Sequence, residues 1–79
     1  MRIDKFLKVS RVIKRRTVAN EAADSGRISV NGKVVKASYE VKVGDIVEIK
    51  FGDKTSKFQI IEIPKVQGRD MGELIKLID

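Results

Sequence analysis

Apolar positions at the start of the chain recur at the spacing of an α-helix. Within residues 2–10, three apolar side chains fall on one face and two lysines fall nearly opposite: Ile3, Phe6 and Leu7 against Lys5 and Lys8. The apolar residues at 12 and 13 break this period, so the helix is expected to end near residue 10 or 11. The pattern predicts a short amphipathic helix followed by a basic connection.

A second helix is predicted over 18–25. Its apolar side chains are small and share one face, whereas polar ones occupy the other: Val18, Ala19, Ala22 and Ala23 against Asn20, Glu21 and Asp24. The hydroxyl of Thr17 is suited to cap the first turn, so Thr17 is predicted as the N-cap. Gly26 is placed where a helix commonly ends in a positive-φ residue.

The strongest local signal is Asn31-Gly32 between two β-type runs, 27–30 and 33–36. This pair is typical of a two-residue type I′ hairpin, which puts Val30 opposite Lys33. Ile28, Val30 and Val35 then share a core face.

The second half of the chain is predicted to be mainly β. Residues 46–51 and 56–63 form a second hairpin around a turn at 52–54, and Pro64 ends it because proline cannot donate to a ladder. Residues 65–72 are polar and predict a loop. The apolar residues of 73–78 are compatible with a helix or a strand. We expect an α+β domain over 1–64, with two short helices packed on a small, mostly antiparallel sheet, and a C-terminal extension over 65–79.

Composition excludes several kinds of chemistry. The 79 residues contain no Cys, no His and no Trp. Disulfides, ordinary zinc sites and Ser-His-Asp or Cys-His nucleophiles are therefore excluded. The longest apolar runs are too short for a membrane span or a secretory signal. We expect a cytoplasmic binding protein that is not an enzyme and has no metal or cofactor.

Charge is concentrated at one end of the chain. Residues 1–16 hold one acid, Asp4, and seven cations: Arg2, Lys5, Lys8, Arg11, Lys14, Arg15 and Arg16. Residues 17–79 hold ten basic and ten acidic residues, so the whole net charge of +6 lies in the first segment. Such asymmetry favours an anionic partner at that end.

A run of basic residues is most often a solvated surface, but two features favour phosphate binding here. Four of the seven are Arg, whose planar fork suits phosphate oxygens. Residues 14–16 also precede a helix N-terminus, where the dipole favours anions. Asp4 is expected to have a structural role as a partner of nearby cations. The predicted RNA-binding residues are these eight together with Arg27 and Lys33.

Several motifs in this order and spacing resemble the S4 RNA-binding domain, named for ribosomal protein S4. They are Arg-Ile-Asp-Lys-Phe-Leu at 2–7, the basic stretch 11–16, residues 19–26, Arg-Ile-Ser-Val-Asn-Gly-Lys at 27–33 and Val-Gly-Asp at 43–45. The resemblance covers about residues 1–50 and implies an S4-type (alpha-L) fold. The stretch 8–17, with nothing catalytic after it, is most similar to the free-standing bacterial RqcP group and the small ribosome-associated heat-shock proteins.

This resemblance implies a ribosome-associated role in quality control of stalled nascent chains. The implied partners are 23S rRNA of the 50S subunit, the P-site tRNA and an RqcH-type factor that adds an alanine tail, with the chain acting as a monomer. Three alternatives stay open: a DNA-binding helix-turn-helix protein, a general ribosome-assembly factor, and a module that binds an acidic protein. A DNA-reading second helix would bring Glu21 and Asp24 to phosphates, which disfavours the first.

Overall fold

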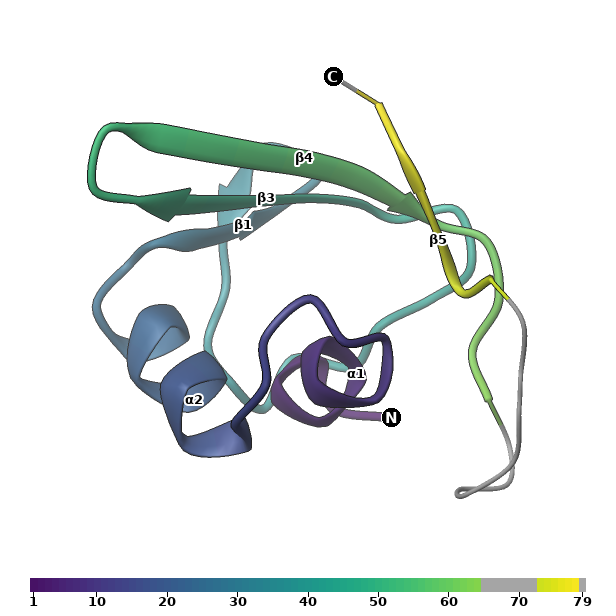
Figure 1. The fold of residues 1–79 in the computed structure, drawn as a ribbon, viewed down its shortest axis with the longest axis horizontal. Coiled ribbons are helices and arrows are strands. Elements are labelled where there is room, and N and C mark those ends of the chain that lie inside the picture. Colours follow the sequence, from purple (N-terminus) through teal and green to yellow (C-terminus); the bar gives the residue numbers. More distant parts are fainter. Residues whose placement is uncertain (65–72, 79) are drawn as a thin grey trace.

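The computed structural model describes residues 1–64 and 73–78. Two helices cover one face of a five-stranded antiparallel sheet with strand order β2-β1-β3-β4-β5 (Figure 1). The elements are α1 (Ile3–Val9), α2 (Arg16–Asp24), β1 (Ile28–Val30), β2 (Lys33–Val34), β3 (Ile46–Phe51), β4 (Lys54–Ile60) and β5 (Ile75–Leu77). The expected α+β arrangement is confirmed.

The core lies between the helices and the sheet. It is built from apolar side chains of both layers: Ile3, Phe6, Leu7, Ile13, Ala19, Ala22, Ala23, Ile28, Val30, Ala37, Val41, Val47, Ile49, Phe58, Ile60 and Leu74. The small alanines of α2 let it approach α1 closely. Val18, which the sequence pattern assigns to the buried face, is 41% exposed because it lies at the edge of that face. Among the described residues no helix is long and apolar enough to cross a membrane.

Helix α2 starts earlier than predicted. Its N-cap position is Arg15, in extended conformation, and no side chain makes a capping hydrogen bond there. The prediction of Thr17 as N-cap is wrong, because Thr17 already lies in the first turn. The earlier start places Arg16 on the helix, from where its guanidinium reaches Asp4 of α1. Helix α2 therefore starts at a position that local capping preferences do not favour. This earlier start is accompanied by the tertiary contact between Arg16 and Asp4.

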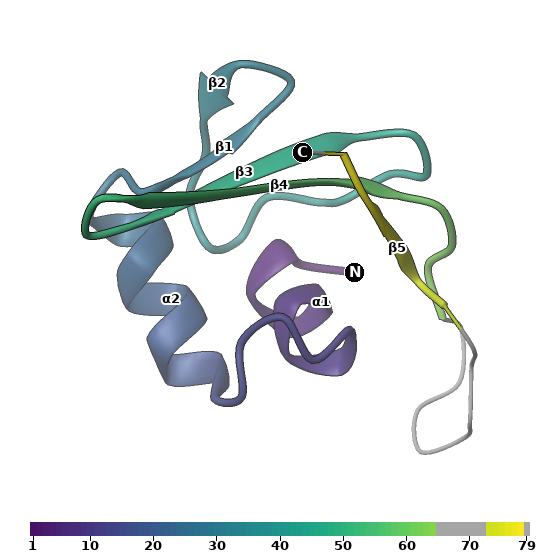
Figure 2. The same ribbon diagram turned by 45° about the horizontal axis from the view of Figure 1, so that its top comes forward.

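The C-terminus of α2 follows the prediction. The Gly26 N–H donates to the Ala23 carbonyl and the Arg27 N–H donates to the Ala22 carbonyl, at 3.0 and 2.9 Å. Gly26 has a φ of 79°, so the pattern is a Schellman motif with glycine in its left-handed position. The chain then turns directly into β1 (Figure 2).

The β1–β2 hairpin is also confirmed. Asn31 and Gly32 both have positive φ, as a type I′ turn requires, and Val30 pairs with Lys33. The side chain of Asn31 does more than suit the turn. Its Nδ2 donates to Asp45 Oδ1 at 3.1 Å, and its Oδ1 accepts the Ile46 N–H at 3.0 Å. These bonds tie the hairpin to the start of β3.

The second hairpin pairs β3 with β4 around the predicted turn, but β4 begins and ends earlier than expected. Phe51 pairs with Lys54 across a two-residue loop. Beyond Ile60, the N–H groups of Ile61 and Glu62 donate to Leu74 instead of continuing the ladder with β3. Residues 75–77 are therefore a strand, β5, which pairs with β4 and settles the helix-or-strand alternative. Residues 65–72, predicted as a loop, lie outside the described residues, and the domain boundary at residue 64 stays a prediction.

The segment between the hairpins holds the N-terminus of the chain in place. The Ile3 N–H donates to the Tyr39 carbonyl at 2.7 Å, and the Val41 N–H donates to the Met1 carbonyl at 3.0 Å. Tyr39 in turn donates its hydroxyl to Asp45, a carboxylate that is only 7% exposed. Burial and the adjacent Asp45 raise the pKa of Tyr39 above its ordinary 10.0. The Asp45 network therefore connects the first hairpin to the residues that begin α1.

Candidate nucleic-acid interface

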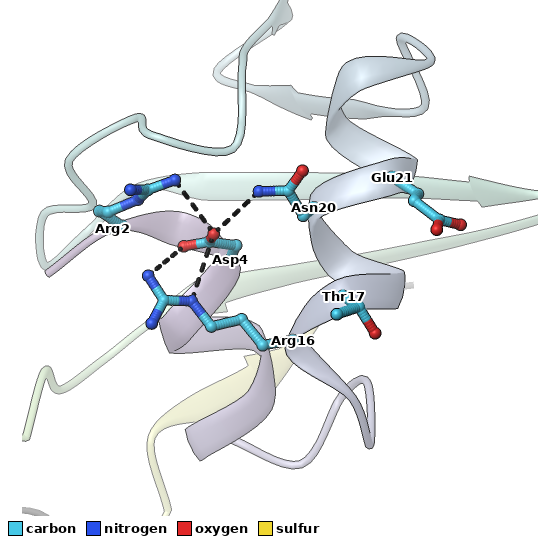
Figure 3. A pocket seen from close by; sticks show the side chains of 6 residues that line it. All are labelled: Arg2, Asp4, Arg16, Thr17, Asn20 and Glu21. Atoms are coloured by element: carbon cyan, nitrogen blue, oxygen red, sulfur yellow. Dashed lines mark hydrogen bonds and ion pairs between the residues drawn. The ribbon is translucent and has the colours of Figure 1, made fainter.

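A buried carboxylate organises the contact between α1 and α2. Asp4 is 1% exposed and accepts from both helices (Figure 3). Its Oδ2 receives Arg2 Nη2 at 3.2 Å, Arg16 Nε at 3.3 Å and Asn20 Nδ2 at 3.3 Å. Its Oδ1 receives the Lys5 N–H at 2.8 Å and Arg16 Nη2 at 3.4 Å. The predicted structural role of Asp4 as a partner of nearby arginines agrees with these contacts.

The pKa of Asp4 reflects a balance that favours the charged form. Burial raises it, but hydrogen bonds from Arg16, Asn20 and the Lys5 N–H, together with the charge of Arg16, outweigh burial and hold the pKa below its ordinary 3.8. Asp4 is thus an anion at neutral pH and orients two guanidiniums at once. The side chains of Arg2 and Arg16 stay 46% and 44% exposed, so each keeps donors directed at solvent.

Beside this ion cluster lies a shallow open pocket of about 400 Å³. Six side chains line it: Arg2, Asp4, Arg16, Thr17, Asn20 and Glu21. Arg2, Arg16 and Asn20 converge on Asp4, whereas Thr17 and Glu21 project from the other side of α2 (Figure 3). The part of the pocket near α1 therefore carries two arginines around one carboxylate, and Glu21 lines the pocket on the side of α2 away from Asp4.

Sequence reasoning placed Asn20 with Glu21 and Asp24 on the outer face of α2, and that assignment is wrong. Asn20 is half-buried and bonds Asp4 instead. The sequence contains a pattern that predicts this position, because Asn20 lies one helical turn after Arg16 and therefore shares its helix face.

The other five predicted cations near α1 and α2 make no ion pair within the described residues: Lys5, Lys8, Arg11, Lys14 and Arg15. Four are exposed, and Lys5 is half-buried. Three of them lie on the connection that leads into the end of α2 farther from the sheet (Figures 1 and 2). We call these five the free cations. Lys14 and Arg15 lie directly before Arg16 at the uncapped N-terminus of α2, where backbone N–H groups also favour an anion.

Arg11 has an unusual backbone. Its φ is 65°, a left-handed conformation that costs an L-residue roughly 1–2 kcal/mol. It follows the C-cap of α1, and its N–H donates to the Lys8 carbonyl at 3.0 Å, as a terminating residue of a helix does. Glycine adopts this conformation at lower cost than arginine does.

Arg27 and Lys33 do not join this group. Arg27 follows the opposite end of α2, about 13 Å of helix away from Arg16. Lys33 starts β2 at the hairpin turn, and both side chains are exposed. The ten predicted residues therefore fall into a helix group of eight and a sheet group of two, and whether each contacts RNA stays a prediction.

The chain is similar to several proteins of known name. Two relatives named "RQC P-site tRNA stabilizing factor", from Streptococcus pneumoniae and Bacillus subtilis, are each 59% identical to the chain over 63 residues. The match covers 80% of this chain and 72% and 73% of the relatives. The relative of that name from Listeria monocytogenes is 51% identical over 80 residues and covers 96% of this chain and 87% of its own.

Solved structures show the same fold. The solution structure of hypothetical protein HP1423 matches with a TM-score of 0.81 and 33% identity, over 100% of this chain and 98% of that one. Heat shock protein 15 of Vibrio cholerae matches with a TM-score of 0.85 over 99% of this chain and 81% of its own, at 24% identity. The pattern of the S4 domain matches residues 1–47, which include both helices and the first hairpin. More than half of the chain is thus accounted for, and the chain belongs to the S4 domain family.

Proposed function

We propose that the chain binds structured RNA on the large ribosomal subunit, namely 23S rRNA and the P-site tRNA, and acts in ribosome quality control of stalled nascent chains. The names of its relatives support this role. The observation that carries it is the set of exposed cations on the connection into the uncapped N-terminus of α2, together with the two arginines that Asp4 holds in place.

The proposed contact reads the shape of a folded RNA. Short helices cannot enter the deep, narrow major groove of A-form RNA, but Lys and Arg side chains can follow its phosphates and 2′-hydroxyls. Arg2 and Arg16 supply guanidinium groups of fixed orientation, because each uses some of its N–H donors to bind the Asp4 carboxylate. The side chains of the free cations add positive charge and can adjust to the path of the RNA backbone. Such a surface gives affinity that falls steeply with salt.

Three parts of the proposal rest on the resemblance alone. The chain cooperates with an RqcH-type factor during alanine tailing, acts as a monomer and is cytoplasmic through its association with the ribosome. We further propose that it acts by binding and not as an enzyme. The lack of Cys and His in the sequence supports this, since both are common catalytic nucleophiles or bases.

The proposal is tested by co-sedimentation with 50S subunits that carry peptidyl-tRNA, at increasing salt. We expect Lys14→Gln/Arg15→Gln to weaken binding and to reduce the slope of log affinity against log salt by about 1.5, for two lost phosphate contacts. The matched control is Lys42→Gln/Lys54→Gln, which changes net charge equally at exposed positions that belong to neither helix.

Two of the alternative functions predict different outcomes when the binding partner in this experiment is changed. Stronger binding to duplex DNA than to tRNA or rRNA favours the helix-turn-helix alternative. Preference for empty or immature subunits favours an assembly factor. Equal loss in the test and control variants contradicts the assigned surface.

A second prediction separates binding from stability at Arg11. Arg11→Gly relieves the left-handed backbone while it removes one cation. We expect the free energy of unfolding to stay constant or to rise by up to about 1 kcal/mol, and the salt slope of RNA binding to fall by about 1. Arg11→Ala should lose the same binding without the gain in stability. If both variants bind RNA with wild-type affinity, Arg11 does not belong to the binding site.

A further inference from the structure

The face of the sheet turned away from α1 and α2 has a charge pattern of its own. Side chains alternate between faces along a strand. The residues buried under the helices are Val47 and Ile49 of β3 and Phe58 and Ile60 of β4. Their neighbours Glu48, Lys50, Lys57 and Gln59 therefore lie on the opposite, outer face. Lys76 pairs with Gln59, so it lies on the outer face too.

A line of cations crosses this outer face, with one member on or beside each of four adjacent strands. We call Arg27, Lys50, Lys57 and Lys76 the outer-sheet stripe. The Lys50 N–H donates to the Arg27 carbonyl at 2.9 Å, which extends the β1–β3 ladder and sets these two residues opposite one another. Lys57 lies on the strand next to that of Lys50 and is displaced along it by two residues. Lys76 is displaced in the same way from Lys57. The Cα atoms of each of these two diagonal pairs are therefore ~8 Å apart.

Internal partners do not explain the stripe. All four side chains are exposed, and within residues 1–64 and 73–78 none makes an ion pair. Arg27 and Lys50 are like charges at directly opposed positions, an arrangement that destabilises a sheet. Among the outer-face positions of the five strands, Glu48 is the one acid, and it lies directly opposite Lys57, where opposite charges stabilise a sheet. With one acid beside four cations, the outer-sheet stripe keeps an excess of positive charge, which is complementary to a polyanion.

We propose that the outer-sheet stripe is a second RNA-binding surface, which contacts the ribose-phosphate backbone of a segment other than the one held by α1 and α2. This rests on the RNA binding proposed above. The sheet and the core separate the stripe from the helices, so one copy can hold two RNA segments on opposite sides (Figure 1). The stripe contains no aromatic side chain on which bases could stack, so the contact is to the backbone.

The test is a bridging experiment. A folded tRNA is fixed to a surface, and retention of a fluorescent A-form RNA hairpin is measured with and without the protein. We expect wild-type protein to retain the hairpin in complexes that contain one protein copy, as determined by their mass. Lys50→Gln/Lys57→Gln should still bind the tRNA but lose most of the retained hairpin, with a salt slope for hairpin binding lower by about 1.5. Lys42→Gln/Lys54→Gln, with the same net charge, should behave as wild type.

Several results would contradict the proposal that the outer-sheet stripe binds RNA. One is that Lys50→Gln/Lys57→Gln retains as much RNA hairpin as wild type does. Another is that bridging requires two protein copies. If polyglutamate displaces the hairpin as well as RNA of equal charge does, the partner is an acidic polypeptide. A wild-type protein that binds no RNA contradicts the proposed function itself, which distinguishes that failure from failure of the stripe alone.

Discussion

Asp4→Asn should weaken both the fold and RNA binding, although it raises the formal net charge from +6 to +7. The carboxylate is buried and offsets two guanidiniums, and an amide has only one acceptor oxygen for the donors that now surround it. Removing one partner of a buried ion pair costs about 3–5 kcal/mol. Because Arg2 and Arg16 are half exposed and can turn to water, we expect about 2–3 kcal/mol here, measured by urea unfolding.

RNA binding by Asp4→Asn gives the sharper test. If charge alone governed affinity, the extra positive charge would strengthen binding. We expect weaker binding at a temperature where the variant is folded, because Arg2 and Arg16 lose their fixed direction. Asp24→Asn is the matched control, since it makes the same charge change at an exposed position of α2. Equal or tighter binding by Asp4→Asn would show that the orientation of the arginines does not matter.

The pH dependence of stability gives a second readout for the same residue. The pKa of Asp4 is lower in the folded chain than its ordinary 3.8. Its charged form therefore stabilises the fold fully above that value, and the contribution is lost as pH falls through the folded pKa. We expect the unfolding free energies of wild type and Asp4→Asn to converge below about pH 4. A constant difference down to pH 2 would contradict this assignment.

Local patterns predicted the elements but not how the site is assembled. The hairpin at Asn31-Gly32 and the glycine end of α2 need only neighbouring residues, so the sequence determines them. The start of α2 differs from the prediction at Thr17, where the contact between Arg16 and Asp4 accompanies an earlier start. That contact joins residues twelve apart in sequence, and it exists only once the two helices pack together.

Charge counting along the chain also hid one feature. Residues 17–79 carry no net charge, so beyond the first segment the sequence analysis assigned only Arg27 and Lys33 to RNA binding. In the folded chain, strand alternation sorts these charges by face. Lys50 and Lys57 belong to the outer face, whereas Asp45 is buried and Glu21 lies on α2. A sum over sequence cannot detect this sorting, because it depends on strand register.

Asp45→Asn should destabilise the fold while leaving the RNA surface intact once the chain is folded. The carboxylate accepts from Lys42 N–H at 2.9 Å, Asn31 Nδ2 at 3.1 Å and the Tyr39 hydroxyl at 3.3 Å. The amide cannot accept all three, and a buried donor left without a partner costs about 1–3 kcal/mol. For a chain of 79 residues, a loss of 2 kcal/mol lowers the melting temperature by about 8–16 °C.

Tyr39 reports on the same network directly, because it is the single tyrosine of a chain without tryptophan. Burial and the negative charge of Asp45 hold its pKa above 10.0, so Asp45→Asn should lower that pKa in an absorbance titration of the folded protein. The salt slope of RNA binding should match wild type, since Asp45 faces Tyr39 and the hairpin and does not contact the free cations. An unchanged tyrosine titration would show that Asp45 does not act on Tyr39. A reduced salt slope would instead extend the RNA surface to the loop of residues 37–45, which holds the start of α1 through backbone bonds.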